Sequence, residues 1–130
     1  MAVNLNPETR EIPLVFKDYT LIFILRDCTT EEMFQHLNML SDKNEGKKVD
    51  ASQQGFRIEF VDKLLLDIKV LTETGEQEEV VYTDPVTKEE KPLTPDIPDW
   101  KKHIKDLYKL LAAGELEQNY FNIETARLKN

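Results

Sequence analysis

Few residues in this chain have the type and spacing that metal binding or catalysis requires. Of the two histidines, His36 follows Glu32 by one helical turn, and such a pair could supply half of a zinc site. Zinc takes three or four ligands in proteins, and no cysteine or second histidine lies at ligand spacing. We therefore interpret His36 and Glu32 as a solvated ion pair, and His103, among lysines, as an exposed residue.

The other patterns that carry chemistry are also missing. The chain has 4 glycines, and they do not form a GxGxxG or Walker loop for phosphate. Ser41 and Ser52 are the only serines, and neither has the flanking glycines of a nucleophile elbow. The stretch 42–46 resembles a calcium loop but lacks the ligand alternation and the terminal glutamate of an EF-hand. The sequence predicts no catalytic residue, no metal site and no cofactor.

Composition and charge narrow the class of protein further. A chain of 130 residues, 40% hydrophobic and 32% charged, is expected to fold as one domain with a thin core. Of the net charge of −8, residues 72–97 carry −6, with two basic and eight acidic side chains. Such a surface repels phosphate backbones, so we expect no nucleic-acid partner.

Targeting patterns are absent from the sequence as well. Residues 1–7 lack the basic and apolar runs of a signal peptide, and the apolar run 21–25 is too short to span a bilayer. The single cysteine, Cys28, has no internal disulfide partner and suits a reducing cytoplasm. Beside a strand end, it is interpreted as a small, half-buried side chain rather than a reactive thiol.

Two apolar runs, 12–16 and 20–26, predict an N-terminal β-hairpin with its turn at 17–19. Pro13 cannot donate to a strand ladder, so the first run should be an edge strand. The second run is apolar on both faces, so we expect helices or a partner chain to cover both sides of it. An edge of this kind tends to pair with another chain, so we also expect a dimer or a larger ring.

A helix is predicted to begin at Thr29, because Thr29 and Glu32 have the spacing of a capping box. Its apolar stripe would contain Met33, Leu37 and Leu40, with Phe34 beside them. The polar stretch 41–54 is then predicted to be an exposed loop.

Residues 56–71 fit both a strand and a helix. Alternation favours a strand at Phe56, Ile58, Phe60 and again at Leu66, Ile68, Val70, whereas a helical stripe joins Val61, Leu64, Leu65, Ile68 and Leu71. Sixteen residues without glycine or proline exceed the usual length of a strand, so we predict a helix that stops before Gly75.

The remaining elements are a short strand at 79–82, a turn that starts at Asp84, and an acidic loop that continues to 96. Pro98 suits the first position of a final helix, which Gly114 would end. Its core-facing stripe would be Trp100, Ile104, Leu107 and Leu111, with lysines on the outer face. Residues 115–130 would form a short helix or a flexible, partner-binding tail. The predicted fold is α+β, one domain over 1–130 with the hairpin packed on two or three helices.

Large aromatic side chains gather in the last third of the chain, and such rings are enriched at protein interfaces. Trp100 is interpreted as a core residue. The candidate partner-binding residues are Tyr108, Tyr120, Phe121 and Ile123.

The order of these elements resembles that of the small tail assembly chaperones of long-tailed bacteriophages and prophages. The similarity lies in the apolar hairpin, the Arg26-Asp27-Cys28-Thr29-Thr30-Glu31-Glu32 helix start, the amphipathic segment 60–71, the Ile97-Pro98-x-Trp100 helix start, and the ending Leu128-Lys129-Asn130. The resemblance implies a non-catalytic chaperone in the cytoplasm of a bacterial host. It would coat the hydrophobic tape-measure protein, recruit tail-tube subunits, and be absent from the mature virion.

Two other classes stay open from the sequence. One is an acidic regulatory or immunity-type module whose loop 73–96 occludes a basic partner. The other is a small enzyme whose site assembles from residues that are scattered along the chain.

Overall fold

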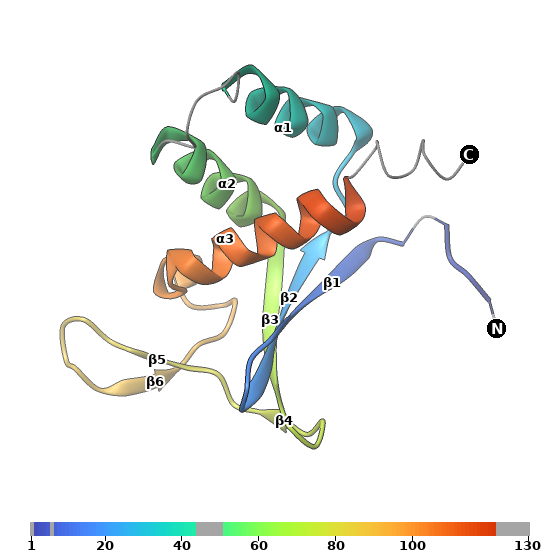
Figure 1. Ribbon diagram of the computed structural model, residues 1–130. Coiled ribbons are helices and arrows are strands. Elements are labelled where there is room, and N and C mark those ends of the chain that lie inside the picture. The colour runs from blue at the N-terminus through green and yellow to red at the C-terminus, as the bar shows by residue number, and fades with distance from the viewer. Residues whose placement is uncertain (1, 6, 44–50, 122–130) are drawn as a thin grey trace.

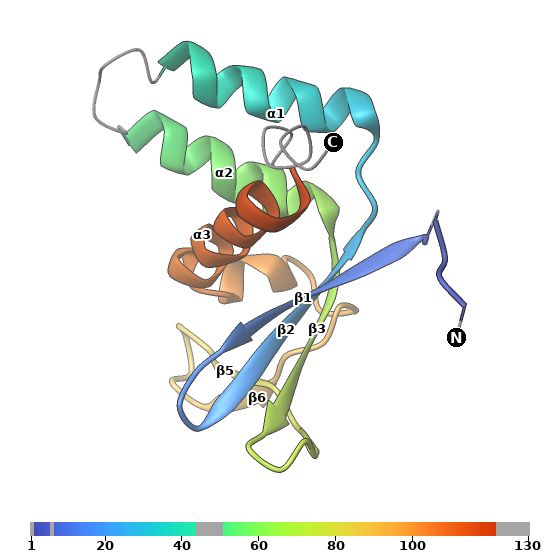
Figure 2. The ribbon, with the colours of Figure 1, turned by 45° about the vertical axis from the view of Figure 1, so that its right-hand side comes forward.

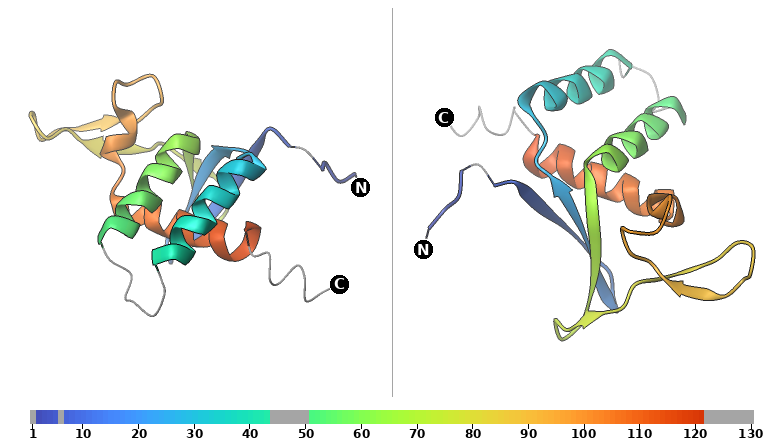
Figure 3. Two further views of the ribbon diagram at one scale, coloured as in Figure 1. Left: turned by 90° about the horizontal axis from the view of Figure 1, so that it is seen from above. Right: turned by 180° about the vertical axis from the view of Figure 1, so that it is seen from behind.

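The computed structural model describes residues 2–5, 7–43 and 51–121, and the fold is α+β as expected. A four-stranded antiparallel sheet in the order β1-β2-β3-β4 packs against three α-helices (Figure 1). A two-stranded hairpin, β5-β6, forms a second sheet whose turn projects from this body (Figures 1 and 3), while Tyr82 of β5 packs against the core. Ile123 and the rest of the predicted tail after Phe121 lie outside the described residues.

The N-terminal hairpin is confirmed. β1 (Thr9–Val15) pairs with β2 (Tyr19–Arg26), and Ile12 lies opposite Phe23. β1 is an edge strand, and Pro13 is exposed on it, as predicted. The alternation in β1 is that of a half-buried strand, with Ile12 and Leu14 buried between exposed neighbours.

The first helix, α1 (Thr30–Lys43), begins at the predicted capping box. The Thr29 amide donates to Glu32 Oε1 at 2.9 Å, and the Glu32 amide donates to Thr29 Oγ1 at 3.1 Å. Met33 and Leu37 pack against the core, whereas Phe34 is exposed. The side chain of Leu40 lies outside the described part.

The predicted loop at 41–54 and the predicted helix at 56–71 are both partly wrong. α1 continues to Lys43, and α2 (Ala51–Leu64) begins before the predicted start; residues 44–50 lie outside the described part. At Leu64 the chain leaves the helix and forms β3 (Leu65–Thr72), which pairs with β2. β3 forms backbone hydrogen bonds with β2, and its residues Leu65 and Ile68 are buried. This tertiary pairing outweighs the length of the segment, which by itself favoured a helix.

The turn after β3 contains Gly75, whose φ of 88° lies in the left-handed region that glycine adopts without strain. It leads to β4 (Gln77–Glu78) and then to β5 (Val81–Thr83) and β6 (Glu90–Pro92). The predicted strand at 79–82 is therefore correct only at Val81 and Tyr82. The turn at Asp84 is confirmed, because its carboxylate accepts from the amide of Val86 at 2.8 Å.

The C-terminal segment differs most from its prediction. A 3-10 helix, η1 (Trp100–His103), is separated by a break from α3 (Asp106–Glu115), and α3 runs directly into a π-helical turn, η2 (Leu116–Tyr120). Gly114 therefore does not end the helix. Since the break changes the helical phase, the core receives Trp100 and Ile104 as predicted, but then Lys109, Ala112, Ala113 and Leu116 in place of the two predicted leucines.

One hydrophobic core joins the sheet to the helices. It lies on the side of the sheet where Leu21, Phe23 and Leu25 of β2 project, and α3 crosses that side (Figures 1 and 2). α1 and α2 lie side by side at the end of the sheet where β2 leaves and β3 begins (Figure 2). We call the side that contacts the core the inner face and the opposite side the outer face.

Candidate functional site

The three candidate partner-binding residues that the structure describes do not form one surface. Tyr108 is half-buried near the start of α3, where its hydroxyl lies 3.0 Å from that of Tyr19. Phe121 is buried at the other end of the segment, against the ring of Phe60. Only Tyr120 is exposed among the three that the structure describes, with the Arg10 guanidinium over its ring. Because Phe121 belongs to the core, its replacement would disturb the fold, and it cannot serve as a specific test of binding.

The exposed apolar surface of α3 comes instead from two leucines that the sequence pattern assigned to the core. Leu107 is 61% exposed and Leu111 is 41% exposed, and they lie one helical turn apart. We call them the α3 leucine pair. Both project away from the buried positions Lys109, Ala112 and Ala113 of the same helix. The signal that could have identified them is the pair Ala112-Ala113, since small residues permit the close approach of a helix to a sheet.

A buried polar cluster holds the end of this segment in place. His36 is only 1% exposed, so its interpretation as a solvated ion pair with Glu32 is wrong. Its Nε2 lies 2.7 Å from Oε2 of Glu117, a residue 81 positions later in η2. The Nε of Arg57 in α2 donates to the same carboxylate oxygen at 3.0 Å. Helices α1 and α2 are thereby joined to η2.

The electrostatics of this cluster stabilise the charged form of Glu117. Burial by itself would raise its pKa, but the hydrogen bonds from His36 and Arg57 outweigh burial and hold the pKa below its ordinary value. The His36 ring also stacks on Phe60, with ring centroids 4.3 Å apart, and contacts Phe121 edge to face.

A histidine beside a carboxylate is also the base-and-orienter pair of a catalytic triad. Here the described contacts of the pair are a guanidinium and aromatic rings, and no hydroxyl or thiol lies at hydrogen-bond distance among them. A pocket of about 180 Å³ beside the cluster is lined by Glu32, Gln35, His36, Phe56, Glu59, Phe60 and Lys63, which include no hydroxyl or thiol side chain. The contacts of His36 and Arg57 with Glu117 position η2 against α1 and α2.

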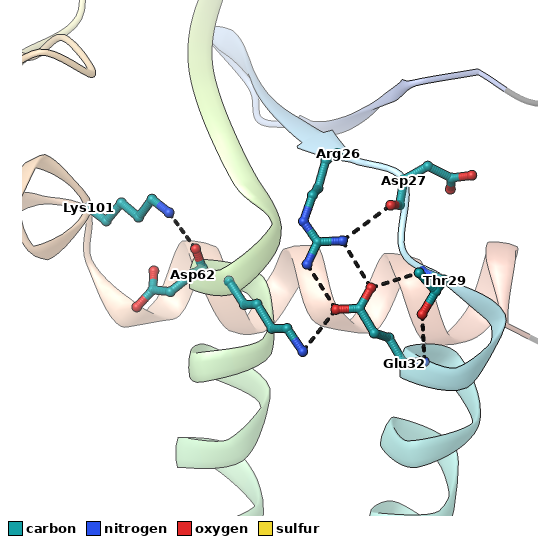
Figure 4. Close-up of polar contacts among 7 residues, drawn as sticks. Arg26, Asp27, Thr29, Glu32, Asp62 and Lys101 are labelled. Atoms are coloured by element: carbon teal, nitrogen blue, oxygen red, sulfur yellow. Dashed lines mark hydrogen bonds and ion pairs between the residues drawn. The ribbon is translucent and has the colours of Figure 1, made fainter.

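A second polar cluster connects the helices to the sheet around Glu32 (Figure 4). Arg26, the last residue of β2, donates to both carboxylate oxygens of Glu32, at 2.9 and 2.8 Å. Lys63 at the end of α2 lies 2.8 Å from the same carboxylate. The hydrogen bonds from Arg26 and then from Lys63 hold the pKa of Glu32 far below its ordinary value. Glu32 thus joins β2, α1 and α2 at one point.

A third polar contact lies under α3. Lys109 is buried, contrary to its predicted place on the outer face, and its Nζ lies 2.9 Å from Oδ1 of Asp62. Lys101 donates to the backbone oxygen of Asp62 at 2.6 Å (Figure 4). His103, which was predicted to be exposed, is half-buried and stacks on Tyr82, with ring centroids 4.1 Å apart. α2 and the start of the C-terminal segment are joined in this way.

Among the residues that the structure describes, no group of three or more His, Cys, Asp or Glu side chains could hold a metal ion. Cys28 is half-buried, as interpreted from the sequence, and burial raises the pKa of its thiol. Within the same described ranges, no helix is long and apolar enough to cross a membrane. Comparisons with protein-family models, with curated proteins and with solved structures found no match.

Proposed function

We propose that this chain is a non-catalytic, protein-binding chaperone of bacteriophage tail assembly. Its client would be the hydrophobic tape-measure protein, and it would help to recruit tail-tube subunits in the cytoplasm of the bacterial host before leaving the assembled particle. The class rests on the resemblance in the order of sequence elements. The single structural observation that supports it is the α3 leucine pair, which places two large apolar side chains on the exposed face of a helix.

The physical argument concerns a client helix with an apolar face. Leucines one turn apart form the kind of ridge on which an apolar helix packs, and covering them removes apolar surface from water. The net charge of −8 keeps complexes apart by mutual repulsion while the client remains covered. Since the buried polar clusters fix η2 and α2 against the body, α3 would present this surface without rearrangement.

Co-expression with tape-measure fragments tests the proposal. We expect the chain to keep an apolar helical fragment soluble, and the double variant Leu107→Ser/Leu111→Ser to lose most of that activity. Removing a central apolar anchor typically costs about 2 kcal/mol of binding free energy or more, which corresponds to a roughly 30-fold weaker complex.

The matched control is Val86→Ser, which removes an apolar side chain that is more exposed but lies at the tip of the β5-β6 hairpin. It should leave the solubilised fraction unchanged. Circular dichroism must show the same folded signal for all variants. Full activity of the double leucine variant would place the binding surface elsewhere, and failure of the unchanged chain to solubilise any fragment would contradict the chaperone proposal.

A second candidate function is an acidic regulatory or immunity-type module. The observation that favours it is the β5-β6 hairpin, which projects from the body within the stretch 72–97 of net charge −6 (Figures 1 and 3). Its turn is held by Asp84, which receives hydrogen bonds from Lys91 and from the Val86 amide, so that Val86 is 87% exposed. Binding that Glu89→Lys/Glu90→Lys abolishes, and that the α3 leucine variant preserves, would favour this function.

A further inference from the structure

A mostly apolar pocket lies on the inner side of the sheet, next to the break between η1 and α3. Its volume is about 240 Å³, which is that of roughly eight water molecules in the liquid. Its apolar walls come from the central strands and from the base of the β5-β6 hairpin: Leu21, Ile68 and Val70, and Val80, Val81 and Leu93. The Leu93 amide donates to the Val80 oxygen at 2.8 Å, which closes the base of the hairpin beside the pocket. We call this space the β2–α3 pocket.

The break between η1 and α3 supplies polar side chains to the same pocket. Lys105 precedes Tyr108 by one helical turn, and the Tyr108 amide donates to the Lys105 oxygen at 3.1 Å. Side chains three positions apart lie on the same side of a helix, so the ammonium of Lys105 can reach the region of the Tyr108 hydroxyl. That hydroxyl lies 3.0 Å from the hydroxyl of Tyr19, at the start of β2. His103 of η1 also lines the pocket.

This polar side of the pocket keeps donors that no described residue uses. Only one of the two hydroxyls can donate in the bond between Tyr19 and Tyr108, so the hydrogen of the other has no acceptor within the described ranges. Lys105 is exposed and forms no ion pair with any residue that the structure describes. One O–H group and one ammonium are therefore available to a ligand.

The charge of the pocket is opposite to that of the whole chain. The protein carries 25 Asp and Glu residues against 17 Lys and Arg, yet the described lining holds one lysine, one histidine and no carboxylate. A carboxylate would accept charge-assisted hydrogen bonds on the α3 side, while an apolar body would be favoured against the strands. The lining thus complements a molecule that has an anionic head and an apolar tail.

We propose that the β2–α3 pocket binds a small monocarboxylate with an apolar tail of about seven carbons, close to what its volume admits. The carboxylate faces Lys105 and the tyrosine hydroxyls, and the tail lies against Ile68, Val70 and Leu93. The lining includes neither member of the α3 leucine pair, so the proposal does not depend on the client-binding function.

Titration of the full chain with octanoate, followed by amide NMR spectra, tests the proposal. We expect saturable binding of one octanoate with a Kd of about 1 mM or tighter. The amide signals of Val70, Val80 and Leu93 should shift, and that of Val86 at the hairpin tip should not. Hexanoate should bind roughly 15-fold more weakly, because each buried methylene contributes about a factor of four in affinity. Octylammonium, which has an equally apolar tail and the opposite charge, should give no saturable shift.

Two substitutions test the carboxylate end. Lys105→Gln and Tyr108→Phe should each weaken octanoate binding roughly fivefold, since each removes one donor to the carboxylate. The affinity for octanol, which lacks the negative charge, should be the same in the unchanged chain and in Lys105→Gln. The matched control is Lys102→Gln, which removes an exposed lysine that does not line the pocket and should leave octanoate binding unchanged.

The proposal is overturned if octanoate shows no saturable binding, if octylammonium binds as tightly, or if the shifted amides lie away from the pocket. Equal weakening by Lys102→Gln and Lys105→Gln would also overturn it, because the general charge of the surface would then attract the anion. Shifts at the pocket with an apolar peptide, and none with octanoate, would assign the pocket to a protein partner instead. Thermal unfolding of each variant confirms that the chains compared are folded.

Discussion

The two faces of the sheet differ in what covers them, although β2 places apolar side chains on both. On the inner face, Phe23 is fully buried in the core, where α3 lies over the sheet. On the outer face, the neighbouring Ile22 is 7% exposed and remains outside the contiguous core, and Lys69 and Glu11 form an ion pair between the two flanking strands. An apolar pattern therefore indicates which faces of a strand need to be covered. The arrangement of the helices determines which of these faces is covered within one chain.

The largest difference in stability between the two faces is expected at the centre of the inner face. Phe23→Ala should lower the free energy of unfolding by about 3–5 kcal/mol, since it removes a fully buried ring and leaves a cavity. Ile24→Ala, one residue away on the outer face, should lower the free energy of unfolding by about 1 kcal/mol, in the range of an ordinary substitution. Chemical denaturation of both variants measures the difference, and equal losses would show that the outer face is covered as well as the inner one.

The attachment of the helices to the sheet depends on Glu32. Glu32→Gln should lower the free energy of unfolding by about 2 kcal/mol, because charge-assisted hydrogen bonds from Arg26 and Lys63 are weakened. The matched control Glu31→Gln changes an exposed carboxylate in the same helical turn. It should lower the free energy of unfolding by roughly 0.5 kcal/mol or less.

The same residue predicts an acid dependence with a definite sign. The pKa of Glu32 is lowered in the folded state, so the unfolded chain binds its proton more readily. This contribution should be complete above the ordinary glutamate pKa of about 4.3 and decrease as pH falls below it. The difference in unfolding free energy between the unchanged chain and Glu32→Gln should therefore shrink from pH 6 toward acid, and a constant difference would contradict the assignment.

A smaller effect on stability is expected at the buried ion pair between Lys109 and Asp62. Lys109→Met replaces a buried ammonium with an apolar chain of similar length, and it leaves Asp62 Oδ1, which is buried, without its cation although the Asp62 side chain as a whole is 36% exposed. The free energy of unfolding should fall by about 1–2 kcal/mol, because removal of one partner leaves a carboxylate that is only partly hydrated. Denaturant titration decides this, and a loss above about 3 kcal/mol would mean that the pair fixes α3 on α2.

The smallest effect on stability should come from a substitution on the free edge of β1. Pro13→Val restores an N–H on the free side of β1 and should change the unfolding free energy by about 0.5 kcal/mol or less. The consequence should appear in association: larger, concentration-dependent assemblies that bind thioflavin T, formed through the opened edge. If light scattering shows no new assemblies, the proline is not what protects this edge.

Sequence reasoning was reliable where the physical cause lies within a few residues. The hairpin over 9–26, the place of Pro13 on its edge, and the Thr29–Glu32 capping box depend on alternation, on a missing N–H and on side chains three residues apart. The burial of Trp100 belongs here too, since a large ring near a helix start has few alternatives to the core. The α+β class follows from these local elements.

Tertiary structure alone decided the features whose partners are remote in sequence. Residues 65–72 satisfy both periodicities, and pairing with β2 makes them a strand. His36 meets Glu117 across 81 positions, so no spacing rule relates them, and the interpretation of His36 from the sequence as a solvated ion pair with Glu32 was wrong. The break at Ile104 and Lys105 rotates the later positions of the final segment, which buries Lys109 and exposes Leu107. A helix's period is encoded locally, but its phase toward the core is set by the surface on which it packs.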